Sequence, residues 1–86
     1  MRDMLGKFGD IVLLYLLEQN DWTNMSDIRR DTDLGQAAVA TGILNIKELN
    51  LIEERRGDRN AREFKLNEKG IEIGKDVKKL QDKLKN

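Results

Sequence analysis

Two short apolar runs flank a strongly basic turn in residues 51–70, LIEERRGDRNAREFKLNEKG. Leu51-Ile52 precedes the turn, and Glu63-Phe64-Lys65-Leu66 alternates polar with apolar residues after it. The residues between them, Gly57-Asp58-Arg59-Asn60, are typical of a turn, so the stretch predicts a β-hairpin. Four arginines crowd around this turn: Arg55, Arg56, Arg59 and Arg62. A solvated loop tip does not need so much positive charge, so we expect a negatively charged partner there.

A helix over residues 36–49, QAAVATGILNIKEL, is predicted immediately before the hairpin. Val39, Ile43 and Ile46 recur at the spacing of one helical face. Asn50 follows where the helix must end, and Asn tolerates the left-handed conformation of a C-terminal cap. The side chains left on or near the outer face are uncharged: Gln36, Ala37, Ala38, Ala40, Thr41 and Asn45.

Two further helices are predicted toward the N-terminus. Residues 7–20, KFGDIVLLYLLEQN, are apolar on nearly every side, which indicates a helix buried on more than one face and covered in part by a partner chain. After a break at Asp21-Trp22-Thr23, with one or two residues of strand, a short helix of sequence MSDIRRDTD follows. Asn24 or Ser26 can cap this helix. The turn Leu34-Gly35 then leads into the helix over residues 36–49.

The last predicted helix covers about residues 68–84, with Asn67 as its cap. Its apolar side chains step by 4, 3 and 4 positions, which predicts a coiled-coil-like seam on a lysine-rich helix. We expect this seam to pack against the apolar N-terminal residues of a second copy across a two-fold axis. Alternatively, the helix folds back and buries the seam on its own chain. The residues assigned to the homodimer interface are Met4, Leu5, Phe8, Ile73, Val77, Leu80 and Leu84.

Composition indicates a single domain, residues 1–86, with a core of about residues 7–67 and no linker. The chain has no histidine and no cysteine, which removes the commonest general base, a thiolate nucleophile and the commonest transition-metal ligands. No nucleophile–base pair, glycine-rich phosphate loop or metal-ligand set is present either. We therefore expect no enzyme activity and no cofactor. The longest apolar run, residues 11–17, is too short to span a bilayer, so a cytoplasmic location is expected.

Charge is distributed unevenly along a chain that is neutral overall, with 16 basic and 16 acidic residues. Residues 18–33 contain five carboxylates and two arginines, a net charge of −3. Residues 55–65 contain five basic and two acidic residues, a net charge of +3. Phosphate groups are attracted by such a local patch, whatever the net charge of the chain.

The order of these elements carries a family resemblance. Residues 25–70 place a short helix before a tight turn, a helix that ends at a Leu-Ile pair, a basic hairpin, and a helix start of the form Leu-x-x-x-Gly at Leu66 to Gly70. This stretch resembles the core of winged helix-turn-helix DNA-binding regulators, in particular MarR-, PadR- and ArsR-like proteins. The resemblance implies a mostly α fold with a small β-hairpin, in the order α-(β)-α-α-β-β-α, and a C-terminal dimerisation helix.

The resemblance also implies a function: a dimeric DNA-binding transcriptional regulator, expected to be a repressor. Residues 36–49 would enter the major groove, where Gln36 could bond adenine and the Ala and Thr side chains could touch thymine methyl groups. The hairpin would act as a wing on phosphates or in the minor groove. The wing residues are Arg55, Arg56, Arg59, Asn60 and Arg62. No residue pattern names a small-molecule effector, and an ArsR-style thiolate metal sensor is not expected.

Two other functions stay open at this stage. The uncharged outer face of residues 36–49 favours a non-specific architectural DNA-binding protein, although the zero net charge argues against one. The acidic stretch at residues 18–33 would suit a winged helix that binds another protein. Gly42, which costs its helix about 1 kcal/mol relative to Ala, either allows a close approach to DNA or to another helix, or is simply tolerated at its position.

Overall fold

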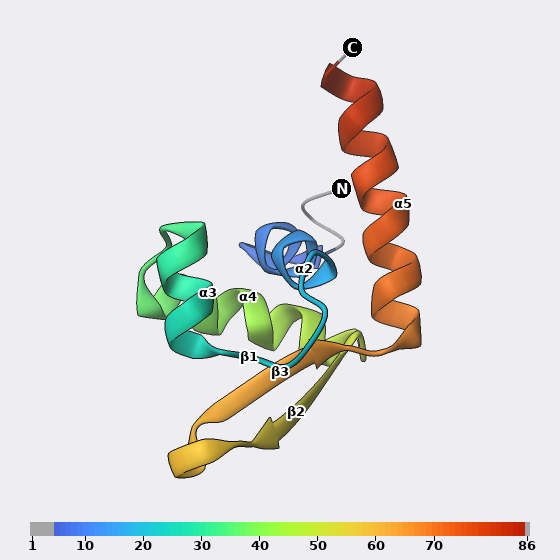
Figure 1. Cartoon of the computed structure of the whole chain (residues 1–86). Helices are drawn as coiled ribbons and strands as arrows, with labels where there is room; N and C mark the ends of the chain where they lie inside the picture. Colours follow the sequence, from blue (N-terminus) through green and yellow to red (C-terminus); the bar gives the residue numbers. More distant parts are fainter. Residues whose placement is uncertain (1–4, 86) are drawn as a thin grey trace.

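The computed structural model describes residues 5–85, which form four α-helices and one three-stranded antiparallel sheet of order β1-β3-β2. In chain order the elements are α2 (Gly9–Leu17), β1 (Thr23–Asn24), α3 (Met25–Thr32), α4 (Gln36–Glu48), β2 (Ile52–Arg56), the 3-10 turn η1 (Asp58–Asn60), β3 (Arg62–Leu66) and α5 (Glu68–Lys85). The sheet lies beneath the helices, and the hairpin of β2 and β3 projects away from them (Figure 1). This order confirms the predicted fold class.

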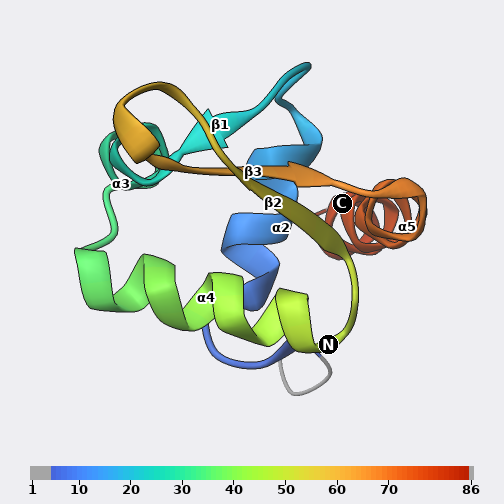
Figure 2. The same ribbon diagram turned by 90° about the horizontal axis from the view of Figure 1, so that it is seen from below.

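Helix α2 lies at the centre of the molecule (Figures 1 and 2) and packs against α3, α4, α5 and β3. Its side chains Val12, Leu13 and Leu16 are buried. The helix is shorter than the predicted residues 7–20, because Phe8 has a φ of 63° and cannot extend the helix toward the N-terminus. Neighbouring elements of the same chain thus cover most of the apolar surface for which the sequence predicted a partner chain.

Helix α4 packs against α2 through the predicted core face. Val39, Ile43 and Ile46 are all buried. A side chain at Gly42 would come within 2.7 Å of both the carbonyl oxygen of Phe8 and a methyl group of Val12. The glycine is therefore required for the close approach of α4 to α2, and this favours helix packing over approach to DNA and over local tolerance.

The cap of α3 and the links around it follow from local polar chemistry. The Asn24 side chain accepts a hydrogen bond from the Asp27 amide at 2.8 Å, which confirms one of the two predicted caps. The Tyr15 hydroxyl donates a hydrogen bond of 2.6 Å to Asp31 and so ties α2 to α3. Burial, together with this hydrogen bond, raises the pKa of Tyr15 to about 12.

The first turn of α5 and the residue before it form hydrogen bonds with the loop that joins α4 to β2. Asn50 ends α4 with a φ of 60°, as predicted. The Asn67 amide donates to the Leu51 carbonyl at 3.1 Å, and its side chain donates to the Asn50 carbonyl at 2.8 Å. The same side chain accepts from the Gly70 amide at 2.7 Å and caps α5. Any side chain at position 70 would collide with the Leu51 carbonyl. These contacts explain the residue pattern Leu-Asn-x-x-Gly in physical terms.

Gly42→Ala is expected to lower the free energy of unfolding by about 1–3 kcal/mol, because the new methyl group overpacks the contact between α2 and α4. The gain of about 1 kcal/mol in helix propensity is too small to offset this loss. Urea unfolding followed by circular dichroism measures the change. Gly74→Ala in α5 is the matched control, since its methyl group would meet the flexible end of Leu17 at 3.3 Å. We expect the control to be neutral or stabilising; equal losses in both variants would contradict this account.

Candidate nucleic-acid interface

Helix α4 and the hairpin diverge from the loop of residues 49–51. The N-terminal end of α4 and the tip of the hairpin lie at the same end of the molecule in both views (Figures 1 and 2). The two segments that the sequence assigned to DNA thus extend from one loop toward the same end of the molecule.

The outward face of α4 carries uncharged and mostly short side chains along most of its length. Gln36, Ala37, Ala40 and Thr41 are exposed, and Ala38 is half-buried. Leu44 lies on the same face with 55% of its surface exposed. The sequence reasoning missed Leu44, although a helix that turns positions 39, 43 and 46 inward must turn position 44 outward.

Asn45 and Lys47, the remaining polar side chains of interest on α4, are engaged within the chain. The Asn45 side chain is half-buried and donates a hydrogen bond of 2.8 Å to the carbonyl of Lys7. The Lys47 ammonium lies 3.1 Å from Glu54 on β2. The structure thus gives Asn45 a structural bond to the N-terminal segment, and its assignment to DNA stays a prediction.

Glu54 links helix α4 to the hairpin. Its carboxylate accepts two hydrogen bonds from Arg62, at 2.9 and 3.2 Å, and also pairs with Lys47. Glu54 and Arg62 lie diagonally on one face of the hairpin, because Glu54 pairs with Phe64 in the strand register. The hydrogen bonds from Arg62, followed by that from Lys47, lower the pKa of Glu54 to about 2. One of the predicted wing arginines is therefore neutralised by its own hairpin.

Arg55 is engaged on the opposite face of the hairpin. Its guanidinium lies 2.8 Å from the Glu63 carboxylate, its cross-strand neighbour, and 4.4 Å from the centre of the Trp22 ring. Cation–π stacking and the ion pair fix the arginine against the sheet. Trp22 accordingly supports the hairpin from the segment that precedes β1.

The tip of the hairpin retains positive charge without carboxylate partners. Arg56 donates a hydrogen bond of 3.1 Å to the carbonyl of Asn60, and Arg59 is exposed at the tip. Within residues 5–85 neither arginine forms an ion pair. Arg59 and Asn60 both have positive φ, of 57° and 60°, so the tip has a tightly folded backbone. Of the five predicted wing residues, Arg56, Arg59 and Asn60 lie at the tip, and Arg55 and Arg62 brace the strands.

The residues assigned to a dimer interface fall into two groups. Leu5 and Val77 are buried in the core of their own chain, and Phe8 and Ile73 are half-buried. Leu80 and Leu84, by contrast, are 42% and 84% exposed on α5. Met4 lies outside the described residues. The surface that remains for a second copy is thus the C-terminal half of α5, and the interface itself stays a prediction.

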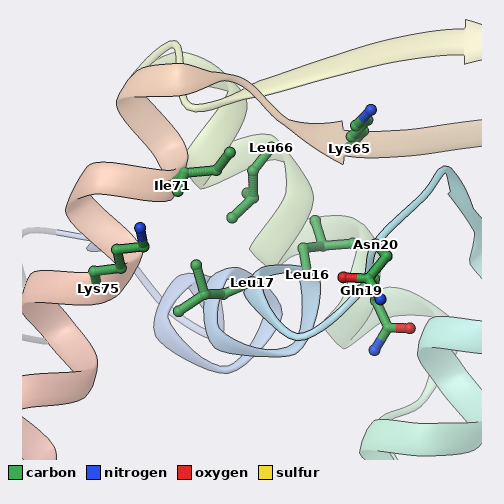
Figure 3. A pocket seen from close by; sticks show the side chains of 8 residues that line it. All are labelled: Leu16, Leu17, Gln19, Asn20, Lys65, Leu66, Ile71 and Lys75. Atoms are coloured by element: carbon green, nitrogen blue, oxygen red, sulfur yellow. The ribbon is translucent and has the colours of Figure 1, made fainter.

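A surface hollow of about 280 Å³ lies between the end of α2, the end of β3 and α5. Apolar side chains line its centre, between Lys75 on α5 and Lys65 on β3 (Figure 3). Its lining residues are Leu16, Leu17, Gln19, Asn20, Lys65, Leu66, Ile71 and Lys75. None of them belongs to α4 or to the hairpin tip, so the hollow is separate from the candidate interface.

Other kinds of site find little support in the described part of the chain. Residues 5–85 contain no group of three or more His, Cys, Asp or Glu side chains placed to hold a metal ion. Among the same residues, every helix is too short or too polar to cross a membrane.

The Glu54 carboxylate gives a pH-dependent prediction. Because the fold lowers its pKa, its contribution to stability is fully present above about pH 4.5, the ordinary value, and is lost as the pH falls toward 2. Glu54→Gln should therefore lower the free energy of unfolding at neutral pH, on the order of 1 kcal/mol since the group is partly open to water. The two stability profiles should converge between pH 4.5 and 2 in urea titrations.

Glu53→Gln provides the control, since Glu53 is exposed on the other face of the same strand. This variant should follow the parent profile at every pH. A constant gap between Glu54→Gln and the parent down to pH 2 would show that the ion pairs with Arg62 and Lys47 do not hold the hairpin.

Comparisons with known proteins bear on the fold. No protein-family model and no curated protein sequence matches the chain. A mutant of ZitR from Lactococcus lactis in its apo form is similar in structure, with a TM-score of 0.81 and 23% identity, over 95% of this chain and 62% of that one. MepR, a transcription regulator of the Staphylococcus aureus multidrug efflux pump MepA, gives a TM-score of 0.82 at 18% identity, over 98% and 63%. The complex of MepR with DNA gives 0.75 at 18% identity, over 95% and 68%.

The chain spans less than two thirds of the length of the first two of these proteins, 62% and 63%. The likeness extends over nearly all of this chain, from α2 through α5. At this level of identity it shows the fold and nothing finer. The chain has the winged helix-turn-helix fold, with α3 and α4 as the helix-turn-helix and the hairpin of β2 and β3 as the wing.

Proposed function

We propose that this chain is the DNA-binding module of a transcriptional regulator. The observation that supports this most directly is the position of Arg56 and Arg59, which have no carboxylate partner among residues 5–85. They lie at the same end of the molecule as the exposed N-terminal half of α4. An α-helix fits the major groove, and the N-terminal residues of a recognition helix contact the base edges. The arginines of the tip would then lie against the phosphates or in the minor groove that follows.

We further propose that the chain acts as a homodimer. The support is the exposed apolar seam at the end of α5, where Leu80 and Leu84 remain 42% and 84% exposed within residues 5–85. Two copies related by a two-fold axis would present two α4 helices to half-sites about 34–36 Å apart. A dimer bound in this way covers the DNA beneath it and excludes other proteins, so repression is the proposed mode of action.

One alternative function has an observation in its favour. The uncharged outer face of α4 offers few hydrogen-bonding groups to bases, which suits a non-specific architectural DNA-binding protein. Selection from a random duplex pool at about physiological salt separates the two. An enriched inverted repeat supports the regulator, and retention of DNA without any motif supports the architectural protein. If no duplex is retained, the basic tip faces a protein and DNA binding is excluded.

Arg59→Ala should weaken DNA binding about equally for all sequences, because a phosphate contact carries no base information. The plot of log affinity against log salt concentration should become shallower by about one unit. Lys83→Ala is the control: it removes the same charge from the last turn of α5, and that end of the helix lies far from the hairpin (Figure 1). Fluorescence anisotropy over a series of salt concentrations measures both. An unchanged slope for Arg59→Ala would remove the tip from the interface.

Leu80→Lys should dissociate the dimer and weaken DNA binding together, because a charge in an apolar seam is costly to bury. Sedimentation equilibrium and DNA titration of the same samples measure the two effects. Lys79→Ala, at the adjacent exposed position, should change neither. A parent chain that stays monomeric at micromolar concentration would exclude the dimer, and a dissociated variant with full DNA affinity would exclude the coupling.

A further inference from the structure

The outer stripe of α4 has a chemical character that bears on which bases it would recognise. Ala37, Ala40, Thr41 and Leu44 are exposed and follow one another at helical spacing. Leu44 is the largest of them and has 55% of its surface exposed. The exposed side chain of Leu44 keeps apolar surface in contact with water, and an apolar group of a binding partner could cover that surface.

The polar side chains that could compete for base edges on this helix are held elsewhere. Asn45 is bonded to the carbonyl of Lys7, and Lys47 is paired with Glu54. Gln36, at the first position of α4, remains exposed and precedes the stripe. Between positions 37 and 44 the outward surface therefore offers methyl groups and one hydroxyl.

We propose that this stripe contacts thymine methyl groups in the major groove and thereby gives the chain a preference for DNA rich in thymine. The proposal rests on the proposed function, since it assumes that α4 occupies the groove. Thymine presents a methyl group in the major groove, whereas cytosine presents an amino donor there. An alanine or leucine packed on a thymine methyl group buries apolar surface. The same side chain over cytosine would desolvate a donor and supply no acceptor.

Replacement of thymine by deoxyuridine tests this inference, because it removes the methyl group and keeps the Watson–Crick pairing. Two random duplex pools are prepared, one with thymine and one with deoxyuridine throughout, and both are titrated with the full chain. A buried methyl group contributes about 0.8 kcal/mol, so the deoxyuridine pool should bind about fourfold more weakly for each methyl group contacted. A third pool with 5-methylcytosine in place of cytosine should bind more tightly than the thymine pool.

Leu44→Ala isolates the contribution of the helix. Its side chain is exposed, so the variant should fold normally, and its ratio between the two pools should move toward one. Ile71→Ala, an exposed apolar position at the start of α5 in the lining of the hollow, should keep the parent ratio.

The outcomes distinguish this inference from the proposed function. If both pools bind equally and binding weakens with salt, α4 does not contact methyl groups, and the DNA-binding function stands. If Leu44→Ala keeps the full parent ratio, the preference arises from DNA shape and the inference is wrong. If neither pool binds at low salt, the proposed function fails and the inference fails with it.

Discussion

The loop of residues 49–51 is the point on which the arrangement of the rest depends. Here α4 ends, β2 begins, and the first turn of α5 closes over both through Asn67 and Gly70. The hydrogen bonds are short and the glycine leaves no room for a side chain, so the directions of three elements are fixed together. The hairpin therefore projects at a set angle from α4, and the geometry of the candidate interface follows from a contact that lies outside it.

Ion pairs neutralise the arginines on the strands of the basic hairpin, whereas the arginines at its tip stay unpaired within residues 5–85. Glu54 and Glu63 each hold one arginine, on opposite faces of the same two strands. These pairs stiffen a two-stranded ribbon that would be marginal by itself. Arg59 at the tip lacks such a partner within residues 5–85, so its charge is available to an anion. The net charge of +3 over residues 55–65 leaves out Glu54, which pairs with Arg62, and it does not reveal that the unpaired arginines lie at the tip.

The fold could be predicted from sequence because its signals are local. Helical spacing, the caps at Asn24 and Asn67, and the left-handed Asn50 each depend on neighbours in the chain, and the structure confirms them. The candidate site was less predictable because its pairings join distant positions. The bonds of Glu54 to Arg62 and of Asn45 to Lys7 depend on strand register and helix packing, which composition does not reveal. The exposed Leu44 could have been found from the spacing of the core residues.

The seam along α5 shows why periodicity cannot separate contacts within a chain from contacts between chains. Ile73, Val77, Leu80 and Leu84 share one helical face, and all four would satisfy a coiled-coil pattern. The core of the same chain buries Val77 and part of Ile73, because α2 lies beside this half of the helix. Beyond Val77 the helix extends past α2, and among residues 5–85 Leu80 is left 42% exposed and Leu84 84% exposed. The apolar surface available to a second copy therefore lies on the C-terminal half of α5, where burying Leu84 would contribute up to about 1.5–3 kcal/mol and burying the rest of Leu80 correspondingly less.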